Sequence, residues 1–392
     1  MTPAARVQAA VEVMDEILDG SAAEAALLRW ARQSRFAGSK DRRAIRDLVF
    51  GALRQKLSSA AIGGSNSGRG ILLGYVAQSE GFDPEELFSG TGYGPSALSS
   101  AEREILGNPP SLSKSEALDL QEWLIPLAER ALGDDLAATA KVMKARAPTF
   151  LRVNTAKESV DRVLEVLRAD KYAAKKHALS DTAILVEGHP GTLSNHKLYQ
   201  DGIFEFQDTA SQALVDFLSP FQGKSALDFC AGGGGKSLAL AAQGANVLAS
   251  DINFDRMKDL PARAARAGVD IKLSRSDQLS GEYDLVLCDA PCSGSGAWRR
   301  QPDAKWKLTQ SKLEKLTLTQ LEVLENAKRF VSETGILAYA TCSFLKEENE
   351  DVVNRFCKAN SDWRCSAVRN FSILEGGDGF FVATLTQDGD SP

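Results

Sequence analysis

Two cysteines and a glycine-rich segment carry the residue types in this chain that could perform covalent chemistry. Cys292 lies in Asp289-Ala-Pro-Cys-Ser-Gly294, after an apolar run at 283–288, and Cys342 lies in Ala340-Thr-Cys-Ser343, after residues 335–339. Upstream, an expected strand runs into the loop Asp228-Phe-Cys-Ala-Gly-Gly-Gly-Gly-Lys236. Ligands of open α/β sheets bind at the carboxyl ends of the strands. We therefore expect both thiols and the loop to share one site, with covalent chemistry fed by a bound cofactor.

The remaining cysteines fit a different interpretation. The chain has six cysteines without a Cys-x-x-Cys pair, and its three histidines all precede the glycine loop, so we expect no metal site. Free thiols are typical of a reducing compartment, here the cytoplasm.

A buried cysteine is commonly a small apolar core residue, and we assign that role to Cys230, Cys288, Cys357 and Cys365. Cys292 and Cys342 follow the apolar strand cores, which favours reactive thiols.

If the bound cofactor is a methyl donor, a neighbouring thiol suggests one specific reaction. A thiolate that adds to carbon 6 of a pyrimidine makes carbon 5 nucleophilic enough to take a methyl group, and a base then removes the carbon 5 proton. No histidine follows residue 196, so a Cys-His pair cannot form in this part of the chain. Thiolate formation must draw on a cation such as Lys236, on helix N-termini or on proton changes of the substrate.

The glycine loop permits three nucleotide sites. A dinucleotide fingerprint fails because Ser237 stands where Gly or Ala is required. A P-loop fits Gly235-Lys-Ser237, but its first glycine falls on Cys230, although 285–289 could supply the acidic strand that holds magnesium. This near-match keeps a P-loop nucleotide hydrolase open as an alternative.

The third candidate is an S-adenosylmethionine site, which needs acidic residues after successive strands. Asp251 follows the second expected strand and could accept both ribose hydroxyls. Asp277 follows the third strand and could receive the adenine amino group, and Asp289 follows the fourth and could face the methionine ammonium. Each acid alone is also typical of a helix cap or a solvated loop. Three acids after three consecutive strands favour the cofactor site.

The elements that must position these residues follow from periodicity. Residues 3–56 predict amphipathic helices, 58–70 a flexible Gly/Ser-rich loop, and 71–140 short helical pieces with turns. Residues 148–206 predict a small α+β module, and 224–387 alternate strand and helix, which indicates an α/β, mainly parallel sheet covered on both faces. In this last part we expect strands at 225–230, 246–250, 270–274, 283–288, 335–340 and 379–386, and helices near 236–243, 254–267, 309–332 and 346–359.

Composition and charge narrow the class. A chain of 392 residues with 43% apolar and 25% charged residues is typical of a globular protein of two or three domains, and no apolar run suits a membrane span or secretory leader. Net charge is −6, yet residues 29–56, 141–177 and 299–315 carry +7, +6 and +4. A basic track on an acidic body is compatible with a phosphate backbone as ligand. The alternative is that helices simply show basic faces to solvent.

Together these segments resemble the Sun/RsmB (Nop/Sun-type) family of RNA cytosine carbon-5 methyltransferases. The specific part is the pair Asp-Ala-Pro-Cys292 and Thr-Cys342-Ser. The resemblance also covers the glycine loop, Asp251-Ile-Asn-Phe-Asp-Arg256, Arg299-Arg-Gln-Pro-Asp303, Glu347-Glu-Asn349, Gly379-Phe-Phe-Val-Ala383, Leu151-Arg-Val-Asn-Thr155 and Gln207-Asp-Thr-Ala-Ser211.

The resemblance implies roles for these residues. It implies that Cys342 is the nucleophile, that Cys292 releases the product, and that Lys236 and Asp289 border the target base. The family loop usually reads Cys-Ala-Ala-Pro-Gly-Gly-Lys, so Gly232-Gly233 departs from it, and we expect weaker cofactor affinity because the freer loop loses more entropy on ordering. The residues implied to bind S-adenosylmethionine are Cys230, Ala231, Gly232, Gly233, Gly234, Gly235, Lys236, Asp251, Arg256, Asp277 and Asp289.

The resemblance extends to the N-terminus, where Lys40-Asp-Arg-Arg43 and Leu48-Val-Phe-Gly-Ala-Leu-Arg54 are similar to a NusB-like RNA-binding domain. It implies RNA as partner, ribosomal RNA of the small subunit rather than transfer RNA, with the target base flipped out or single-stranded. Arg299, Arg300 and Trp306 are candidates for phosphate and stacking contacts. We expect a monomer with a helical domain over 1–140, a small α+β RNA-binding module over 141–215 and a Rossmann-like catalytic domain over 216–392. A catalytically idle RNA-binding assembly factor stays open as an alternative.

Overall fold

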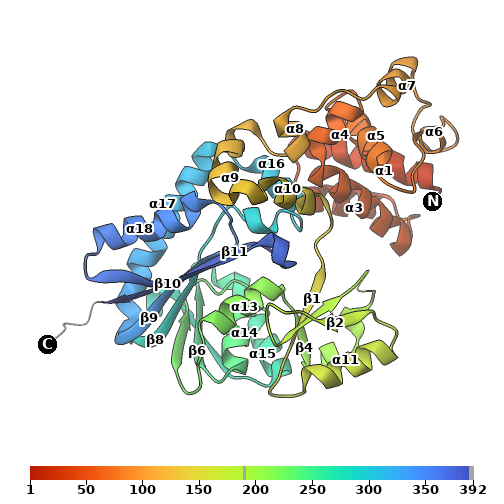
Figure 1. Ribbon diagram of the computed structural model, residues 1–392. Helices are drawn as coiled ribbons and strands as arrows, with labels where there is room; N and C mark the ends of the chain where they lie inside the picture. The colour runs from red at the N-terminus through yellow and green to blue at the C-terminus, as the bar shows by residue number, and fades with distance from the viewer. Residues whose placement is uncertain (189–190, 388–392) are drawn as a thin grey trace. The chain divides into compact units, whose positions relative to one another are not determined.

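A short segment from the second half of the chain, Trp298–Lys307, belongs with residues 1–146 to a helical unit, and the other residues form an α/β unit. Both units are drawn in Figure 1, a computed structural model that describes residues 1–188 and 191–387. Among these residues no helix is both long and apolar enough to cross a membrane. The division into three domains stays a prediction, because contacts separate the chain into two units and assign 298–307 to the first.

A seven-stranded sheet is the centre of the α/β unit. Its strands lie in the order β10-β11-β9-β8-β5-β6-β7, and the neighbours from β9 to β7 pair in parallel, whereas β11 is antiparallel to both of its neighbours. This arrangement confirms the predicted α/β class. The strands are β5 (Ser225–Asp228), β6 (Asn246–Asp251), β7 (Ile271–Arg275), β8 (Tyr283–Asp289), β9 (Val331–Thr341), β10 (Trp363–Phe371) and β11 (Phe380–Gln387).

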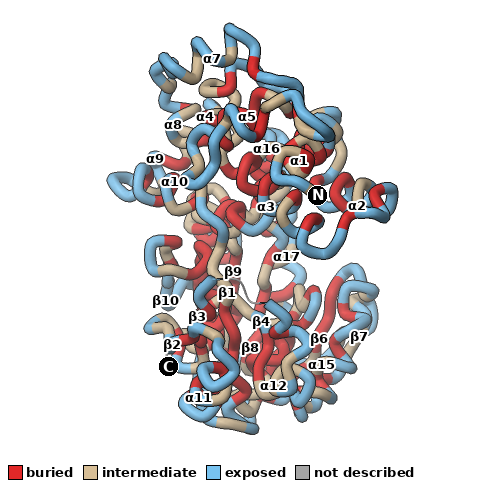
Figure 2. The backbone as a smooth tube through the Cα atoms, turned by 90° about the vertical axis from the view of Figure 1, so that its right-hand side faces the viewer, coloured by how far each residue is buried: buried red, intermediate tan, exposed pale blue. Residues whose placement is uncertain are grey.

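Helices cover both faces of this sheet (Figure 1). On one face α13 (Thr209–Phe217), α14 (Gly235–Ala242) and α15 (Leu260–Ala267) pack against alternate strand residues such as Ala226 and Leu287. On the other, α17 (Gln310–Ala327) and α18 (Glu350–Ala359) pack against the residues between them, including Val286. The strands that both layers cover are buried, as Figure 2 shows for β8 and β9. Burial on both faces explains why these strands are apolar throughout.

A four-stranded antiparallel sheet, ordered β2-β3-β1-β4, forms the predicted α+β module. The helix α11 (Val160–Ala169) packs on it through Val163 and Leu167. Glu205, in the last strand, is opposite Arg152, and both are buried. The strands are β1 (Thr149–Val153), β2 (Ala174–Lys176), β3 (Ala183–Val186) and β4 (Phe204–Phe206), with α12 (Lys197–Gln200) between the last two.

Glycines in the helical unit correct one prediction. The stretch 58–70 is not a flexible loop: α4 ends at Ile62 and α5 begins at Gly68. A Cβ on Gly63 would lie 1.8 Å from the carbonyl oxygen of Gly70, and one on Gly74 would lie 1.9 Å from that of Ser59. The small residues therefore serve close helix packing rather than flexibility. The helices are α1 (Pro3–Leu18), α2 (Ala23–Gln33), α3 (Ser39–Arg54), α4 (Lys56–Ile62), α5 (Gly68–Gln78), α6 (Pro84–Leu87), α7 (Ser100–Gly107), α8 (Lys114–Leu118), α9 (Ile125–Leu132), α10 (Leu136–Lys144) and α16 (Pro302–Lys307).

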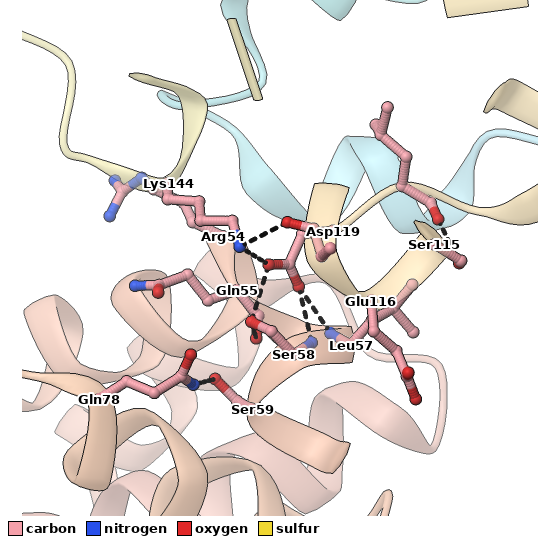
Figure 3. Close-up of polar contacts among 12 residues, drawn as sticks. Arg54, Gln55, Leu57, Ser58, Ser59, Gln78, Ser115, Glu116, Asp119 and Lys144 are labelled. Atoms are coloured by element: carbon pink, nitrogen blue, oxygen red, sulfur yellow. Dashed lines mark hydrogen bonds and ion pairs between the residues drawn. The ribbon is translucent and has the colours of Figure 1, made fainter. Parts of the chain in front are cut away.

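A buried carboxylate joins several of these helices. Asp119 is fully buried, and its carboxylate accepts hydrogen bonds from the backbone N–H of Leu57 (2.9 Å) and Ser58 (3.0 Å) at the N-terminus of α4 (Figure 3). It also pairs with Lys144 Nζ of α10 at 2.7 Å. A negative charge at a helix N-terminus is favourable, and the lysine compensates its burial. Asp119 thus fixes α4, α8 and α10 together.

Candidate active site

The two reactive thiols predicted from the sequence lie beside each other. Cys292 follows β8 and Cys342 follows β9, and because these strands are parallel neighbours their carboxyl ends meet. The two Sγ atoms are 3.4 Å apart. The hydrogen bond to Cys342, together with burial and the nearby charges of Cys342 and Glu348, raises the pKa of Cys292 well above its usual value. Cys292 is therefore a protonated thiol at neutral pH.

A buried glutamate holds both thiol loops, and sequence reasoning assigned it no role. Glu348, fully buried, accepts hydrogen bonds from the backbone N–H of Ser293 at 2.7 Å and from Ser343 Oγ at 2.6 Å, and also from Ser293 Oγ. Gln320 Nε2 of α17 donates to the same carboxylate at 3.1 Å. One carboxylate thus binds the residue after each cysteine. The Glu347-Glu-Asn349 motif was the available signal, but only the fold shows its contacts.

Lys236 and Asp289 form an ion pair at the same edge. Lys236 Nζ lies 2.6 Å from Asp289 Oδ2 and 5.1 Å from the centre of the Phe380 ring. Burial acts to lower the pKa of Lys236, but the charge and hydrogen bond of Asp289, together with the charge of Cys342, outweigh it and the pKa is raised. Lys236 is therefore a cation beside the Cys342 thiol, as thiolate formation without histidine requires.

The glycine loop is held by Asp251, which ends β6. Asp251 Oδ2 accepts from the backbone N–H of Gly232 at 2.9 Å and lies 3.1 Å from Arg256 Nη1. The N–H of Gly234 donates to the carbonyl oxygen of Ala231 at 2.8 Å, and this bond closes a turn. Gly232 and Gly234 have φ of +52° and +77°, a backbone conformation that favours glycine. The loop leads into α14 through Gly235.

Asp228 and Cys230 come just before the four glycines in the chain. Asp228 is buried at the end of β5, where Oδ2 accepts from Ser237 Oγ at 2.5 Å while Oδ1 has no hydrogen-bond partner. Burial raises the pKa of Asp228 to about 6. Burial also raises the pKa of Cys230, and that of the fully buried Cys288. Neither is therefore a reactive thiol, and Cys288 lies in the core as predicted.

The residues considered next differ in how far they are exposed to solvent. Asp277 is exposed in the turn after β7. Ile252, which sequence reasoning missed, follows Asp251 with 94% of its surface exposed. Cys365 is exposed on β10 rather than buried, so the prediction of a core residue is wrong there; β10 is an edge strand with one neighbour.

The candidates for RNA contacts at 299–306 need correction. Arg299 is only 3% exposed, and its carbonyl accepts from Arg54 Nε at 2.7 Å. Trp306 Nε1 donates to the carbonyl of Leu53 at 2.7 Å, and the ring packs against the helical core. Both residues build the helical unit. Burial of Arg299 contradicts its prediction as a phosphate contact, whereas Trp306 is half-buried and its stacking role stays a prediction. Arg300 is exposed, and its role stays a prediction.

No group of three or more residues that could hold a metal ion occurs in the described part of the chain.

Solved structures share this fold. The crystal structure of PH0851 superposes with a TM-score of 0.78 at 21% identity and covers 99% of both chains. A methyltransferase homologue from Pyrococcus horikoshii gives a TM-score of 0.61 at 24% identity and covers 71% of this chain and all of its own. This chain thus shares its fold with these two proteins.

Sequence comparisons identify the family. Residues 215–386 match the family described as 16S rRNA methyltransferase RsmB/F, and residues 120–191 match the RsmF/B-like ferredoxin-like domain. Proteins named ribosomal RNA small subunit methyltransferase B are 31% identical, that of Photorhabdus laumondii over 284 residues and that of Escherichia coli over 280. The matches cover 68% and 67% of this chain, and 66% and 65% of those relatives. The chain belongs to the RsmB/F methyltransferase family, which argues against the P-loop alternative.

S-adenosylmethionine is the cofactor of such a methyltransferase, and the residues at this edge fit it. The positive φ angles of Gly232 and Gly234 let a ligand approach the main chain closely. Asp251 supplies carboxylate oxygens, which accept from hydroxyl groups, beside the exposed apolar side chain of Ile252. Asp228 Oδ1 is a buried oxygen still without a donor.

Proposed function

We propose that this chain methylates carbon 5 of a cytosine in RNA through a covalent adduct between Cys342 and carbon 6. The observation that supports it most is the 3.4 Å separation of the Cys292 and Cys342 sulfur atoms beside the Lys236–Asp289 pair. The match to the 16S rRNA methyltransferase family supports ribosomal RNA of the small subunit as the substrate. S-adenosylmethionine supplies an electrophilic methyl group when bound.

Each side chain of the site has its own role in the proposed reaction. Cys342 Sγ adds to carbon 6 as a thiolate, which makes carbon 5 a nucleophile, and Lys236 stabilises the negative charge before attack. Asp289, paired with Lys236, borders the target base. After methylation a base takes the carbon 5 proton, the bond between Sγ and carbon 6 breaks, and the electron pair returns to Cys342. Cys292 assists this release from 3.4 Å away.

The cofactor is proposed to lie along the glycine loop. Asp251 accepts the ribose hydroxyls, Arg256 supports that carboxylate, and Asp277 receives the adenine amino group. Asp289 faces the methionine ammonium, and residues 230–236 line the remainder. Arg256, whose side chain is 59% exposed, is free to move aside when the hydroxyls arrive.

Two cysteine variants test this function. Purified C342A should lose methyl transfer to small-subunit ribosomal RNA lacking the modification, whereas C292A should accumulate an RNA adduct stable to denaturation. Transfer RNA serves as the competing substrate. Full activity of C342A would refute the mechanism. S-adenosylhomocysteine binding without turnover on any RNA would instead indicate an RNA-binding assembly factor.

The helical unit is proposed to bind RNA. Between α2 and α3, Phe36 is 77% exposed, and Arg32, Arg35, Lys40 and Arg43 nearby in sequence are exposed too. Aromatic rings stack on bases and basic side chains contact phosphates. F36A should weaken RNA binding about tenfold by filter retention without changing affinity for S-adenosylhomocysteine. Equal RNA affinity of F36A and the wild type would contradict this assignment.

A further inference from the structure

Four consecutive glycines, Gly232 to Gly235, form the loop at the carboxyl end of β5. Glycine loses more conformational freedom on folding than any other residue. A loop of this composition therefore needs restraints from outside if it is to stay in one conformation. The N–H of Gly232 is held by the carboxylate of Asp251, and the N–H of Gly234 by the carbonyl oxygen of Ala231. Gly233 lies between them at the outer point of the turn.

An arginine of α15 supplies the restraint on Gly233. Arg263 Nη1 donates to the carbonyl oxygen of Gly233, and a Cβ built on Gly233 would lie 3.6 Å from the same nitrogen. The guanidinium therefore covers the outer side of the turn in ordinary van der Waals contact. A charged donor makes a stronger hydrogen bond to a carbonyl than a neutral one does.

Arg263 is itself aimed by a buried carboxylate. Its Nη2 donates to Glu205 Oε2 at 3.0 Å, and Glu205, in β4 of the small sheet, is only 5% exposed. The other oxygen of Glu205 accepts from Arg266, one turn further along α15. Because Glu205 is held in a strand, the guanidinium of Arg263 has a fixed position from which to bind the loop.

We propose that Arg263 is a positioning residue that holds the glycine loop in the conformation that binds S-adenosylmethionine, with Glu205 fixing its direction. The inference rests on the proposed placement of the cofactor at this loop. It makes the small α+β sheet part of the cofactor site, although no residue of that sheet lies in the loop. It also explains how this chain uses Gly232-Gly233 without a proline to stiffen the turn.

Arg266 provides a matched control, because it lies on the same helix and pairs with the same glutamate. R263M and R266M would be titrated with S-adenosylhomocysteine by calorimetry, and loop mobility followed by hydrogen exchange of the amides of residues 231–235. R263M should weaken binding about tenfold, the effect of one charged hydrogen bond, and speed exchange in the loop. R266M should stay within about twofold of the wild type.

A kinetic readout separates positioning from general damage. In R263M the KM for S-adenosylmethionine should rise, while the KM for RNA stays at the wild-type value. If R263M does not melt cooperatively, R263Q, too short to bind both partners, takes its place. Equal affinity of R263M and the wild type, or equal losses in R263M and R266M, would overturn the inference. Failure of the wild type itself to bind S-adenosylhomocysteine would refute the proposed function instead.

Discussion

The sulfur atoms of Cys292 and Cys342 lie 3.4 Å apart although 50 positions separate the two residues in the chain. Parallel pairing of β8 with β9 brings their loops together, and Glu348 fixes the residue after each thiol. The hydrogen bond that the Cys292 thiol donates to Cys342 is the main reason why the pKa of Cys292 is raised. The two thiols are therefore an interacting pair, with Cys292 as the protonated member.

Removing the sulfur of residue 342 should lower the pKa of Cys292. C342S keeps a side chain of similar shape but cannot become a thiolate, so the raising effect of the Cys342 charge is lost, while burial still holds the pKa above its usual value. The pH dependence of Cys292 alkylation, followed by peptide mass spectrometry, should shift to lower pH in C342S. C365S, which alters an exposed thiol on β10, is the control. An unchanged profile in C342S would show that the two thiols do not interact.

Replacing Glu348 with glutamine should damage both stability and activity. The amide nitrogen of E348Q would face the N–H and hydroxyl donors of Ser293 and Ser343, and a buried donor without an acceptor is costly. We expect a loss of about 3 kcal/mol in the free energy of unfolding. Misplaced thiols should also lower kcat about 100-fold.

Denaturant unfolding measures the loss of stability in E348Q, and methyl-transfer kinetics measure the loss of kcat. The control is E322Q, which alters an exposed residue of α17. Wild-type stability and kcat in E348Q would mean that the two loops hold their positions without the glutamate.

The sequence predicted the sheet because its strands are buried on both faces and read as apolar runs. It missed β10 because that edge strand is exposed from Arg364 to Asn370, so its residues follow no core pattern. It missed β2 because only Ala174 of its three residues is buried. The Gly/Ser-rich stretch 58–70 has the composition of a linker, yet Gly63 within it and Gly74 just beyond it serve helix contact, a distinction that composition does not carry.

For the site, strand order was enough to bring Cys292, Cys342 and the glycine loop to one edge, because parallel strands end together. Glu348 and Arg263 could not be found in this way. Each acts across long sequence separations, Glu348 on Ser293 and Arg263 on Glu205, and neither pairing follows from any local period. Burial of Arg299 likewise depends on where the segment 298–307 packs.

The buried carboxyl of Asp228 should make stability fall as pH rises toward neutrality. Its pKa, raised to about 6 by burial, lies above the value of an unfolded aspartate, so between about pH 4 and pH 6 the folded state holds a proton that the unfolded state has lost. The contribution of Asp228 to the free energy of unfolding is fully present below about pH 4. It decreases between about pH 4 and pH 6, by up to about 1.4 kcal/mol per pH unit. D228N should lack this decrease. Comparing urea unfolding of the two proteins from pH 4 to pH 7 checks it, and parallel curves would contradict the assignment.

A single methyl group on Gly74 should destabilise the helical unit. In G74A the Cβ would lie 1.9 Å from the backbone oxygen of Ser59 and 2.8 Å from the nitrogen of Gly63, so α4 and α5 must move apart. Alanine favours helix by about 1 kcal/mol over glycine, but overpacking against backbone outweighs this, and we expect a net loss of about 3 kcal/mol.

The control for this change is G107A at the end of α7, where a Cβ would meet nothing within 4 Å. It should be neutral or slightly stabilising, because only the helix preference acts there. Thermal denaturation followed by circular dichroism should show a lower melting temperature in G74A but not in G107A, while affinity for S-adenosylhomocysteine stays unchanged, since the glycine loop belongs to the α/β unit. If G74A melted at the same temperature as G107A, α4 and α5 would not be packed through their glycines, and 58–70 would be the flexible loop that its composition suggests.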